Sequence, residues 1–518
     1  MSGSDSSLRR VVDKTRRVMR ARRKHTMLRG TSTASSMEDI AEDQHFPINL
    51  EALRHAVSRF FGRACISCSK LTDGGFHSIY VLQLEEDITD DPDLPVEVIA
   101  RVALPTFSHD KMESEAATKL YIRARTNVPV PKIHFWDSDP DNPVGAEYMV
   151  VERVPGESAA DVWDTFSKDQ KSFVMEQLAG HISEVFNLRI ESIGSLYVHK
   201  DHLKRAWKKS MKLFDKDVDD DATEFEVGPV VCTLYCSDPE DEFPRSHVKN
   251  PNRGPFKSAG EWLSSILEYE LAFTQEHHEE ALEESVLLKT PPDSNTAVDV
   301  DSAQSKGRRQ RQLEFARISL SSLMDLAKSY CGPAVDGPQG HLSTQFSLLH
   351  HDFQLSNLQV DPQTAQILGI LDWEATHSTP LWACARLPNW LAVTSPLPEQ
   401  DEDVKPSIRF GGDEDTAPRI SRCSTRPAVS AADYEEAAEL RKVFLEHVCP
   451  EWREAYEVGR DWQQFQEICC LNWMSWTEPC MRERIDLYRE QAMYHPGVPL
   501  NEQEVENRIR GSKNISVS

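Results

Sequence analysis

Several features that define common protein classes are missing from this chain of 518 residues. It contains no apolar run of about eighteen residues, so we expect no transmembrane helix. Acidic residues outnumber basic ones, 84 Asp and Glu against 58 Lys and Arg, and the net charge of −26 argues against a surface that binds nucleic acid. The same charge favours a well-solvated monomer. No internal repeat is evident, so a repeat architecture is not expected.

A disulfide framework is also missing. The eleven cysteines are odd in number and irregularly spaced, which fits reduced thiols in an intracellular compartment. The pairs Cys65/Cys68 and Cys232/Cys236 have spacings that a zinc site can use. We disfavour such a site, because Cys65 and Cys68 lie in a strand-like segment without a neighbouring histidine.

The charge is unevenly distributed along the chain. Residues 1–30 contain ten Lys and Arg against two Asp, with apolar residues at helical spacing among the arginines. This is the profile of a mitochondrial transit peptide, although the basic cluster Arg20–Lys24 also suits a nuclear signal or a contact with an anionic membrane. We therefore expect residues 1–45 to be a transit peptide or a disordered segment. Mitochondria are the expected location, and the cytoplasm is the alternative.

The chemically most informative segment is LHHDFQLSNLQVDPQTAQILGILDWE, residues 349–374. Asp352 is followed by Asn357 and, at the end of an apolar strand, by Asp372. Phosphoryl transfer from a magnesium nucleotide needs a carboxylate for the acceptor hydroxyl and hard oxygen ligands for the metal. Asp352 fits the first role, and Asn357 and Asp372 fit the second. Each residue alone is an ordinary turn residue, but together they follow the order of a kinase catalytic loop.

Elements that could bind a nucleotide precede this segment. Gly74, Gly75 and Ser78 form a hairpin-like stretch between two strands, where backbone amides can approach phosphates. An ordinary hairpin turn has the same pattern. Arg101 lies on the next predicted strand as a candidate phosphate contact, and Glu115 lies on the following predicted helix, within reach of it.

A crossing between two lobes is expected after the strand Ala146–Glu152. In a two-lobed kinase, the chain at this point offers backbone groups to adenine. We assign those contacts to the backbone of Glu152 and Val154.

The order of these motifs resembles a known family. The segments are GGF, EVIARV, SEAAT, NVPVPKI, VGAEYMVVERVPGE, GSLY, HHDFQLSN and ILDWEATHSTPLW. They are similar to fungal members of the aminoglycoside phosphotransferase-like kinases, and within these to the "altered inheritance of mitochondria" group. The resemblance covers roughly residues 49–390 and, more loosely, the C-terminal helices.

The resemblance implies an α+β, bilobal, protein-kinase-like fold. The small N-terminal lobe, an antiparallel sheet, would occupy residues 46–153, and the larger, mainly helical C-terminal lobe residues 154–500. ATP and magnesium are the implied cofactors, and the implied reaction transfers the γ-phosphoryl group to a hydroxyl of a small-molecule acceptor. Asp352 is then the catalytic base, Asn357 and Asp372 are the metal ligands, and Arg101 with Glu115 anchors the phosphates.

Two residues depart from the family pattern. Arg101 stands where most kinases have lysine, and its planar guanidinium cannot reproduce the geometry of an ammonium group. His351 stands where many phosphotransferases have a small residue before the catalytic aspartate.

Two other functions stay open. One is a nucleotide-binding pseudokinase with a regulatory or scaffold role in mitochondria, although the three oxygen-bearing residues argue for catalysis. The other is a protein kinase, which the missing APE-type signature after Asp372 disfavours.

Polar stretches interrupt the C-terminal part of the chain. Three of them have too little apolar content to pack, and we expect disordered insertions near 215–226, 289–311 and 395–432, followed by a polar tail at 501–518. Between them we expect helices, including Ser167–Leu188 with a capping box at Ser167 and Gln170.

Overall fold

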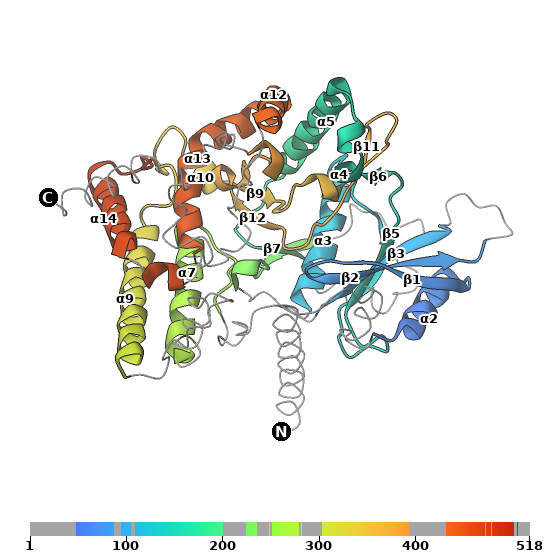
Figure 1. Ribbon diagram of the computed structural model, residues 1–518, viewed down its shortest axis with the longest axis horizontal. Coiled ribbons are helices and arrows are strands. Elements are labelled where there is room, and N and C mark those ends of the chain that lie inside the picture. Colours follow the sequence, from blue (N-terminus) through green and yellow to red (C-terminus); the bar gives the residue numbers. More distant parts are fainter. Residues whose placement is uncertain are drawn as a thin grey trace, which may run out of the picture. The chain divides into compact units, whose positions relative to one another are not determined.

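The computed structural model describes most of the chain in separate stretches. These are residues 48–86, 95–104, 109–199, 224–235, 251–278, 303–392, 431–471, 473–477 and 479–501, with a few single positions between and after them (Figure 1). The expected transit peptide and the tail beyond residue 505 lie outside them. Within these stretches, no helix is both long and apolar enough to cross a membrane.

The chain divides into two compact units. The first contains the described residues up to Met112 together with Phe135–Val151, and the second contains almost all the others. The elements on which the boundary falls are α3 (Asp110–Arg125), β4 (Ile133–Asp137) and β5 (Tyr148–Glu152). Most of α3 therefore groups with the second unit, whereas we expected residues 46–153 to form one N-terminal lobe.

Among its described residues, the first unit contains a five-stranded sheet and one complete helix. Its strand order is β1-β2-β3-β5-β4, and the first three strands are antiparallel. The other elements are β1 (Cys65–Asp73), β2 (His77–Leu84), β3 (Glu97–Ala103) and α2 (Leu50–Phe61).

Helix α2 is defined at both ends by the sequence. The side chain of Asn49 accepts a hydrogen bond from the Ala52 amide at 3.0 Å, and Gly62 ends the helix with φ 66°. Leu53 and Val57 point from α2 into the core formed with the sheet, where both are 0% exposed. Asn49 and Gly62 thus set both bounds of this helix.

The second unit is mainly helical, with three small sheets. The sheets have the orders β11-β10-β6, β12-β9 and β7-β8. Its strands are β6 (Glu157–Ser158), β7 (Ser195–Val198), β8 (Phe225–Gly228), β9 (Phe346–Leu349), β10 (Leu358–Val360), β11 (Ile367–Ile370) and β12 (His377–Pro380). Its α-helices are α4 (Ala159–Val162), α5 (Lys168–Asn187), α7 (Ala259–Glu276), α9 (Ala303–Ala327), α10 (His341–Thr344), α11 (Leu381–Cys384), α12 (Ala431–His447), α13 (Pro450–Cys469) and α14 (Pro479–Tyr494). Short 3-10 turns are η2 (Trp163–Thr165), η4 (Thr233–Tyr235), η6 (Leu355–Asn357), η7 (Asn389–Leu391) and η8 (Trp473–Thr477).

Several predicted elements of this unit are present. The capping box of Ser167 and Gln170 begins α5. Trp462, Phe465 and Trp473 are each 1% exposed, as expected for core residues. An antiparallel sheet together with a larger helical part confirms the α+β class.

Two of the expected disordered insertions contain regular secondary structure at their C-terminal edges. Phe225 begins strand β8, and Ala303 begins helix α9, although both residues fall in stretches predicted to be disordered. Residues 215–223, 289–302 and 395–430 of these stretches lie outside the described residues.

Candidate active site

The loop between β9 and β10 carries the predicted catalytic residues. Strand β9 is buried along its whole length and pairs with β12, so it forms a fixed base for the loop that follows. The turn η6 then brings Asn357 back toward Asp352. Nδ2 of Asn357 donates to the backbone carbonyl of Asp352 at 2.9 Å and to its Oδ2 at 3.1 Å.

A second amide group holds the same carboxylate oxygen. Nε2 of Gln354 donates to Oδ2 of Asp352 at 2.5 Å. Both side-chain donors therefore use Oδ2, and Oδ1 is the oxygen left for an incoming hydroxyl. The sequence reasoning missed Gln354, although its place two residues after Asp352 was a usable signal.

The electrostatics of Asp352 suit a proton acceptor. Partial burial of the carboxyl group raises its pKa, and the nearby charge of Asp372 raises it further, against the lowering effects of His350, Asn357 and Gln354. A carboxylate with a raised pKa accepts a proton more readily than an ordinary aspartate. Asp352 and Asp372 are therefore close enough to interact, as the predicted roles require.

His350 connects the loop to the strand that leads to Asp372. Its Nδ1 accepts from the Asp352 amide at 3.2 Å, and its Nε2 lies 3.0 Å from the Leu371 carbonyl. Because a carbonyl can only accept, the proton of this imidazole is on Nε2. Burial between Phe353 and Trp373 lowers the pKa of His350, so the ring is neutral at neutral pH.

The backbone turns sharply at Asp372. Strand β11 ends at Ile370, the Leu371 amide donates to the Asn357 carbonyl at 2.8 Å, and Asp372 has a φ of 62°. A left-handed conformation costs a non-glycine residue about 1 kcal/mol or more, so the surrounding contacts must maintain it. The observed strain points to a functional constraint on this aspartate.

The donor set fits a magnesium ion. Asn357 uses its amide nitrogen for Asp352, which leaves the amide oxygen for another partner, and Asp372 adds a carboxylate. Carboxylate and amide oxygens are the hard ligands that magnesium prefers. A cation between these groups would also relieve the repulsion that raises the pKa of Asp352.

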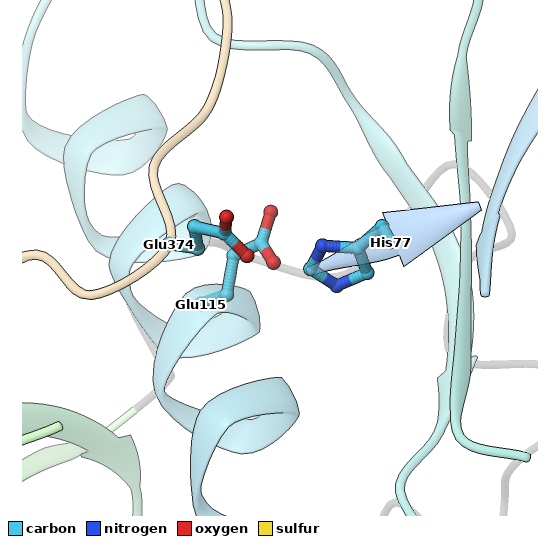
Figure 2. Close-up of side chains that lie close together, drawn as sticks. All are labelled: His77, Glu115 and Glu374. Atoms are coloured by element: carbon cyan, nitrogen blue, oxygen red, sulfur yellow. The ribbon is translucent and has the colours of Figure 1, made fainter. Parts of the chain in front are cut away.

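A second group of charges lies on α3 and after β11 (Figure 2). Lys119 pairs with Glu115 one turn earlier on α3, at 2.6 Å, and both side chains are almost fully buried. Carboxylate oxygens of Glu115 and Glu374 lie within 4.8 Å of each other. Figure 2 also labels His77, at the start of β2 in the first unit. Lys119 and Glu374 were missed by the sequence reasoning, although the D-W-E segment contains Glu374.

The glycine hairpin of the first unit is held by local bonds. The Gly74 amide donates to the His77 carbonyl at 2.8 Å, and the Ser78 hydroxyl donates to Oδ1 of Asp73 at 2.7 Å. A Cβ added at Gly75 would meet no described atom within 4 Å. The backbone around Gly75 is thus open, whereas the Ser78 hydroxyl already has a partner.

Arg101 lies in the middle of β3, opposite Ile79 on β2. Its Nη2 lies 3.4 Å from Nδ1 of His77, which must be the acceptor of any hydrogen bond because a guanidinium only donates. Arg101 belongs to the first unit and Glu115 to the second. Their pairing stays a prediction.

The predicted adenine contacts lie at the end of β5. The Glu152 amide donates to the Lys132 carbonyl at 2.8 Å, so this amide is already used and only the Glu152 carbonyl suits a base. Val154 packs against β11, where a Cβ added at Gly369 would lie 2.7 Å from Cγ1 of Val154. The structure thus brings Asp352, Asn357 and Asp372 together in the second unit, and Gly74, Gly75, Ser78 and Arg101 belong to the first.

Several known proteins are similar to this chain, all at low sequence identity. A subtelomeric hrmA-associated cluster protein of Aspergillus fumigatus is 27% identical over 364 residues, which are 65% of this chain and 63% of that protein. The chain thus covers less than two thirds of that relative. Altered inheritance of mitochondria protein 9, mitochondrial, of Meyerozyma guilliermondii is 27% identical over 137 residues, 26% of this chain and 22% of that protein. Among solved structures, an aminoglycoside-3'-phosphotransferase of type VIII is 14% identical with a TM-score of 0.33, covering 81% of this chain and all of that one. No family model matches the chain.

Proposed function

We propose that this protein is a small-molecule kinase that transfers the γ-phosphoryl group of ATP to an acceptor hydroxyl in the presence of magnesium. The observation that carries the proposal is the hydrogen-bonded pair of Asp352 and Asn357, joined through the Leu371 amide to the strained residue Asp372. The three side chains provide a proton acceptor and two hard oxygen ligands in one loop system.

We propose a separate role for each oxygen of Asp352. Asn357 and Gln354 hold Oδ2 and so fix the plane of the carboxylate. Oδ1 then accepts the hydrogen bond of the acceptor hydroxyl and orients its oxygen toward the phosphoryl group. The raised pKa of Asp352 makes it a better acceptor for the hydroxyl proton as the new bond forms.

Metal and nucleotide would be held by the remaining predicted residues. Asn357 and Asp372 would bind magnesium, which neutralises phosphate charge when bound. Gly74, Gly75, Ser78 and Arg101 are proposed to contact the phosphates. The Ser78 contribution would come from its backbone, since its hydroxyl bonds Asp73.

The proposal includes a kinase-like bilobal arrangement, with the Glu152 carbonyl and the Val154 amide facing adenine. One of the named relatives suggests the biological setting. Because the Meyerozyma relative is named as a mitochondrial protein, we propose a mitochondrial location for this chain as well.

The test is product formation with a panel of small hydroxyl compounds. Wild-type protein should form a phosphoester, detected by phosphorus NMR, only when both ATP and Mg²⁺ are present. Asp372→Asn should raise the Mg²⁺ concentration for half-maximal rate by about tenfold or more, because one carboxylate ligand is lost. Asp325→Asn, the same change at a 76% exposed aspartate on α9, should leave that concentration unchanged.

Two results would count against the proposal. Phosphoester formation with an unchanged Mg²⁺ requirement in Asp372→Asn would exclude that residue as a ligand. Stabilisation by ATP without transfer to any acceptor would favour a regulatory nucleotide-binding protein.

A further inference from the structure

Two histidines that the proposed mechanism does not use lie in direct contact beside the catalytic loop. Nε2 of His351, the residue before Asp352, lies 2.9 Å from Nδ1 of His377 on β12. The two rings stack with centroids 4.6 Å apart and an interplanar angle of 28°. The contact joins the loop between β9 and β10 to the buried strand β12.

His377 is firmly anchored. It is 1% exposed, its backbone lies opposite Leu349 in the ladder between β12 and β9, and the edge of its ring packs against Trp262 on α7. The next residue, Ser378, donates its hydroxyl to the carbonyls of Ser192 at 2.6 Å and Gly194 at 2.9 Å. His377 therefore cannot follow a movement of the loop and acts as a fixed point.

The hydrogen bond between the rings shares one proton. Nδ1 of His377 also lies 3.1 Å from the Ala375 carbonyl, and His351 interacts with the same carbonyl. The bond between the two ring nitrogens therefore forms with either ring as the donor, depending on the tautomer. Burial lowers the pKa of His377 to about 4, so the ring is neutral at neutral pH and does not repel its neighbour.

Packing alone does not explain a histidine at this position. Within the described part of the chain, Nε2 of His377 is buried without a hydrogen-bond partner. A buried polar atom without a partner is unfavourable, and a phenylalanine ring would fill the same space without it. What phenylalanine cannot provide is the ring nitrogen that hydrogen-bonds His351.

We propose that His377 is a positioning residue, which holds His351 by this hydrogen bond and thereby sets the direction of the Asp352 carboxylate. The inference rests on the proposed function, because it concerns the geometry of the same base. His351 and Asp352 are neighbours in the chain, so a rotation of the loop that releases one ring displaces the carboxylate as well. Near-attack geometry is sensitive to displacements of about 1 Å.

Two substitutions separate this role from a packing role. His377→Phe keeps a ring against Trp262 but removes Nδ1 and its hydrogen bond to His351. His377→Asn keeps an amide group, which can donate or accept, close to the position of Nδ1 but loses most of the ring. Thr376→Val, at the residue directly before β12, is the control, since the Thr376 hydroxyl is buried without a partner among the described residues.

The readouts are thermal stability and the kinetics of ATP turnover with Mg²⁺, with water as the acceptor, in the full chain. We expect His377→Phe to lose about tenfold in kcat with an unchanged KM for ATP and an unchanged Tm. His377→Asn should retain most of the kcat despite a lower Tm, and Thr376→Val should match wild type in both. His377→Phe should thus have the lower kcat of the two variants, and His377→Asn the lower Tm.

Other results would overturn the inference. If kcat follows Tm across the three variants, His377 has only a structural role. If both His377 variants keep the wild-type kcat, the contact does not position the base. Wild-type turnover that persists in Asp352→Asn would instead remove the proposed function itself, and with it the role of the histidine pair.

Discussion

The catalytic loop of the second unit and the glycine hairpin of the first unit were both predicted from short motifs, but their polar groups are held differently. In the loop, Asp352 is bonded by Asn357 and Gln354, and its neighbour His351 is bonded by His377. In the hairpin, Gly74 and Ser78 bond His77 and Asp73, the Phe76 carbonyl accepts from Lys111, and the backbone at Gly75 is open. In the loop, two side-chain amides thus hold the carboxylate itself and the neighbouring ring is tied to β12, whereas the hairpin leaves the backbone at Gly75 without such contacts.

This contrast predicts where substitutions act. Changes in and around the loop should alter the rate or the stability strongly, because several elements converge there. Changes in the hairpin should be mild for folding and should act on nucleotide binding. The following predictions test that difference, beginning with the largest expected effect.

Asn357→Ala should have a large effect on catalysis, second only to a change of Asp352 itself. It removes two hydrogen bonds to Asp352 and the proposed amide ligand of the metal, so we expect kcat to fall by about 10²-fold to 10³-fold. Steady-state kinetics across a Mg²⁺ titration measures this effect. Asn142→Ala, at a loop of the first unit, serves as the control for the chemical change, and a comparable loss there would show that the effect is unspecific.

Lys119→Met should have the largest effect on stability. It removes the cation from Glu115 in a site where the two side chains are 3% and 0% exposed, which costs about 3–5 kcal/mol when one partner of a buried pair is lost. Chemical denaturation measures the loss. The exposed pair of Lys168 and Glu439, at 83% and 65%, offers the control, since Lys168→Met should cost about 0–1 kcal/mol. Equal costs would contradict the importance of burial.

The buried histidine should make the protein sensitive to acid. The pKa of His377 is lowered from 6.5 to about 4 in the folded protein, so the unfolded state binds the proton first. Its contribution to stability is complete above pH 6.5 and is lost as the pH falls toward 4, by about 3 kcal/mol at most. As the pH is lowered from 6.5 toward 4, the unfolding free energy of His377→Phe should therefore fall less steeply than that of wild type. An identical pH slope in both proteins would argue against a neutral buried His377.

Substitutions at two glycines should have the smallest effects and allow the most direct comparison. A Cβ at Gly369 would lie 2.7 Å from Val154, so Gly369→Ala should destabilise the protein by about 1–3 kcal/mol. A Cβ at Gly75 meets no described atom within 4 Å, so Gly75→Ala should change stability by less than about 0.5 kcal/mol and act on the KM for ATP instead. A large loss of stability in Gly75→Ala would show that the hairpin is not the open element described above.

Local signals in the sequence predicted local structure well. Asn49 and Gly62 delimit α2, and Ser167 with Gln170 begins α5, because caps act within a few residues. Periodicity was less reliable at single positions. Helical spacing predicts that Phe173 shares the buried face of α5 with Leu178 and Ile182, yet Phe173 is 39% exposed whereas the other two are 0% and 6% exposed. The start of α9 was read as disordered because it is polar, yet its Gln, Lys and Arg residues are good helix formers and lead into Leu313, which is 0% exposed.

The candidate site could be predicted only in part for the same reason. Asp352 and Asn357 lie five residues apart, so one motif contains both. His377 lies 26 residues from His351, and Lys119 and Glu374 lie far apart in the chain. Contacts of this kind depend on how β9 and β12 pair and how α3 packs, which no short motif encodes. The strain at Asp372 and the use of the Glu152 amide by Lys132 are likewise visible only in the folded chain.

The most direct test of the account compares ATP turnover with ATP binding in Asp352→Asn. Asparagine keeps the size of the side chain and its contacts with Asn357 and Gln354 but accepts a proton poorly. The account predicts a kcat lower by about 10²-fold to 10⁴-fold, with a Kd for ATP within about twofold of wild type in calorimetric titrations. A variant that turns over ATP at the wild-type rate would contradict the assignment of Asp352 as the base.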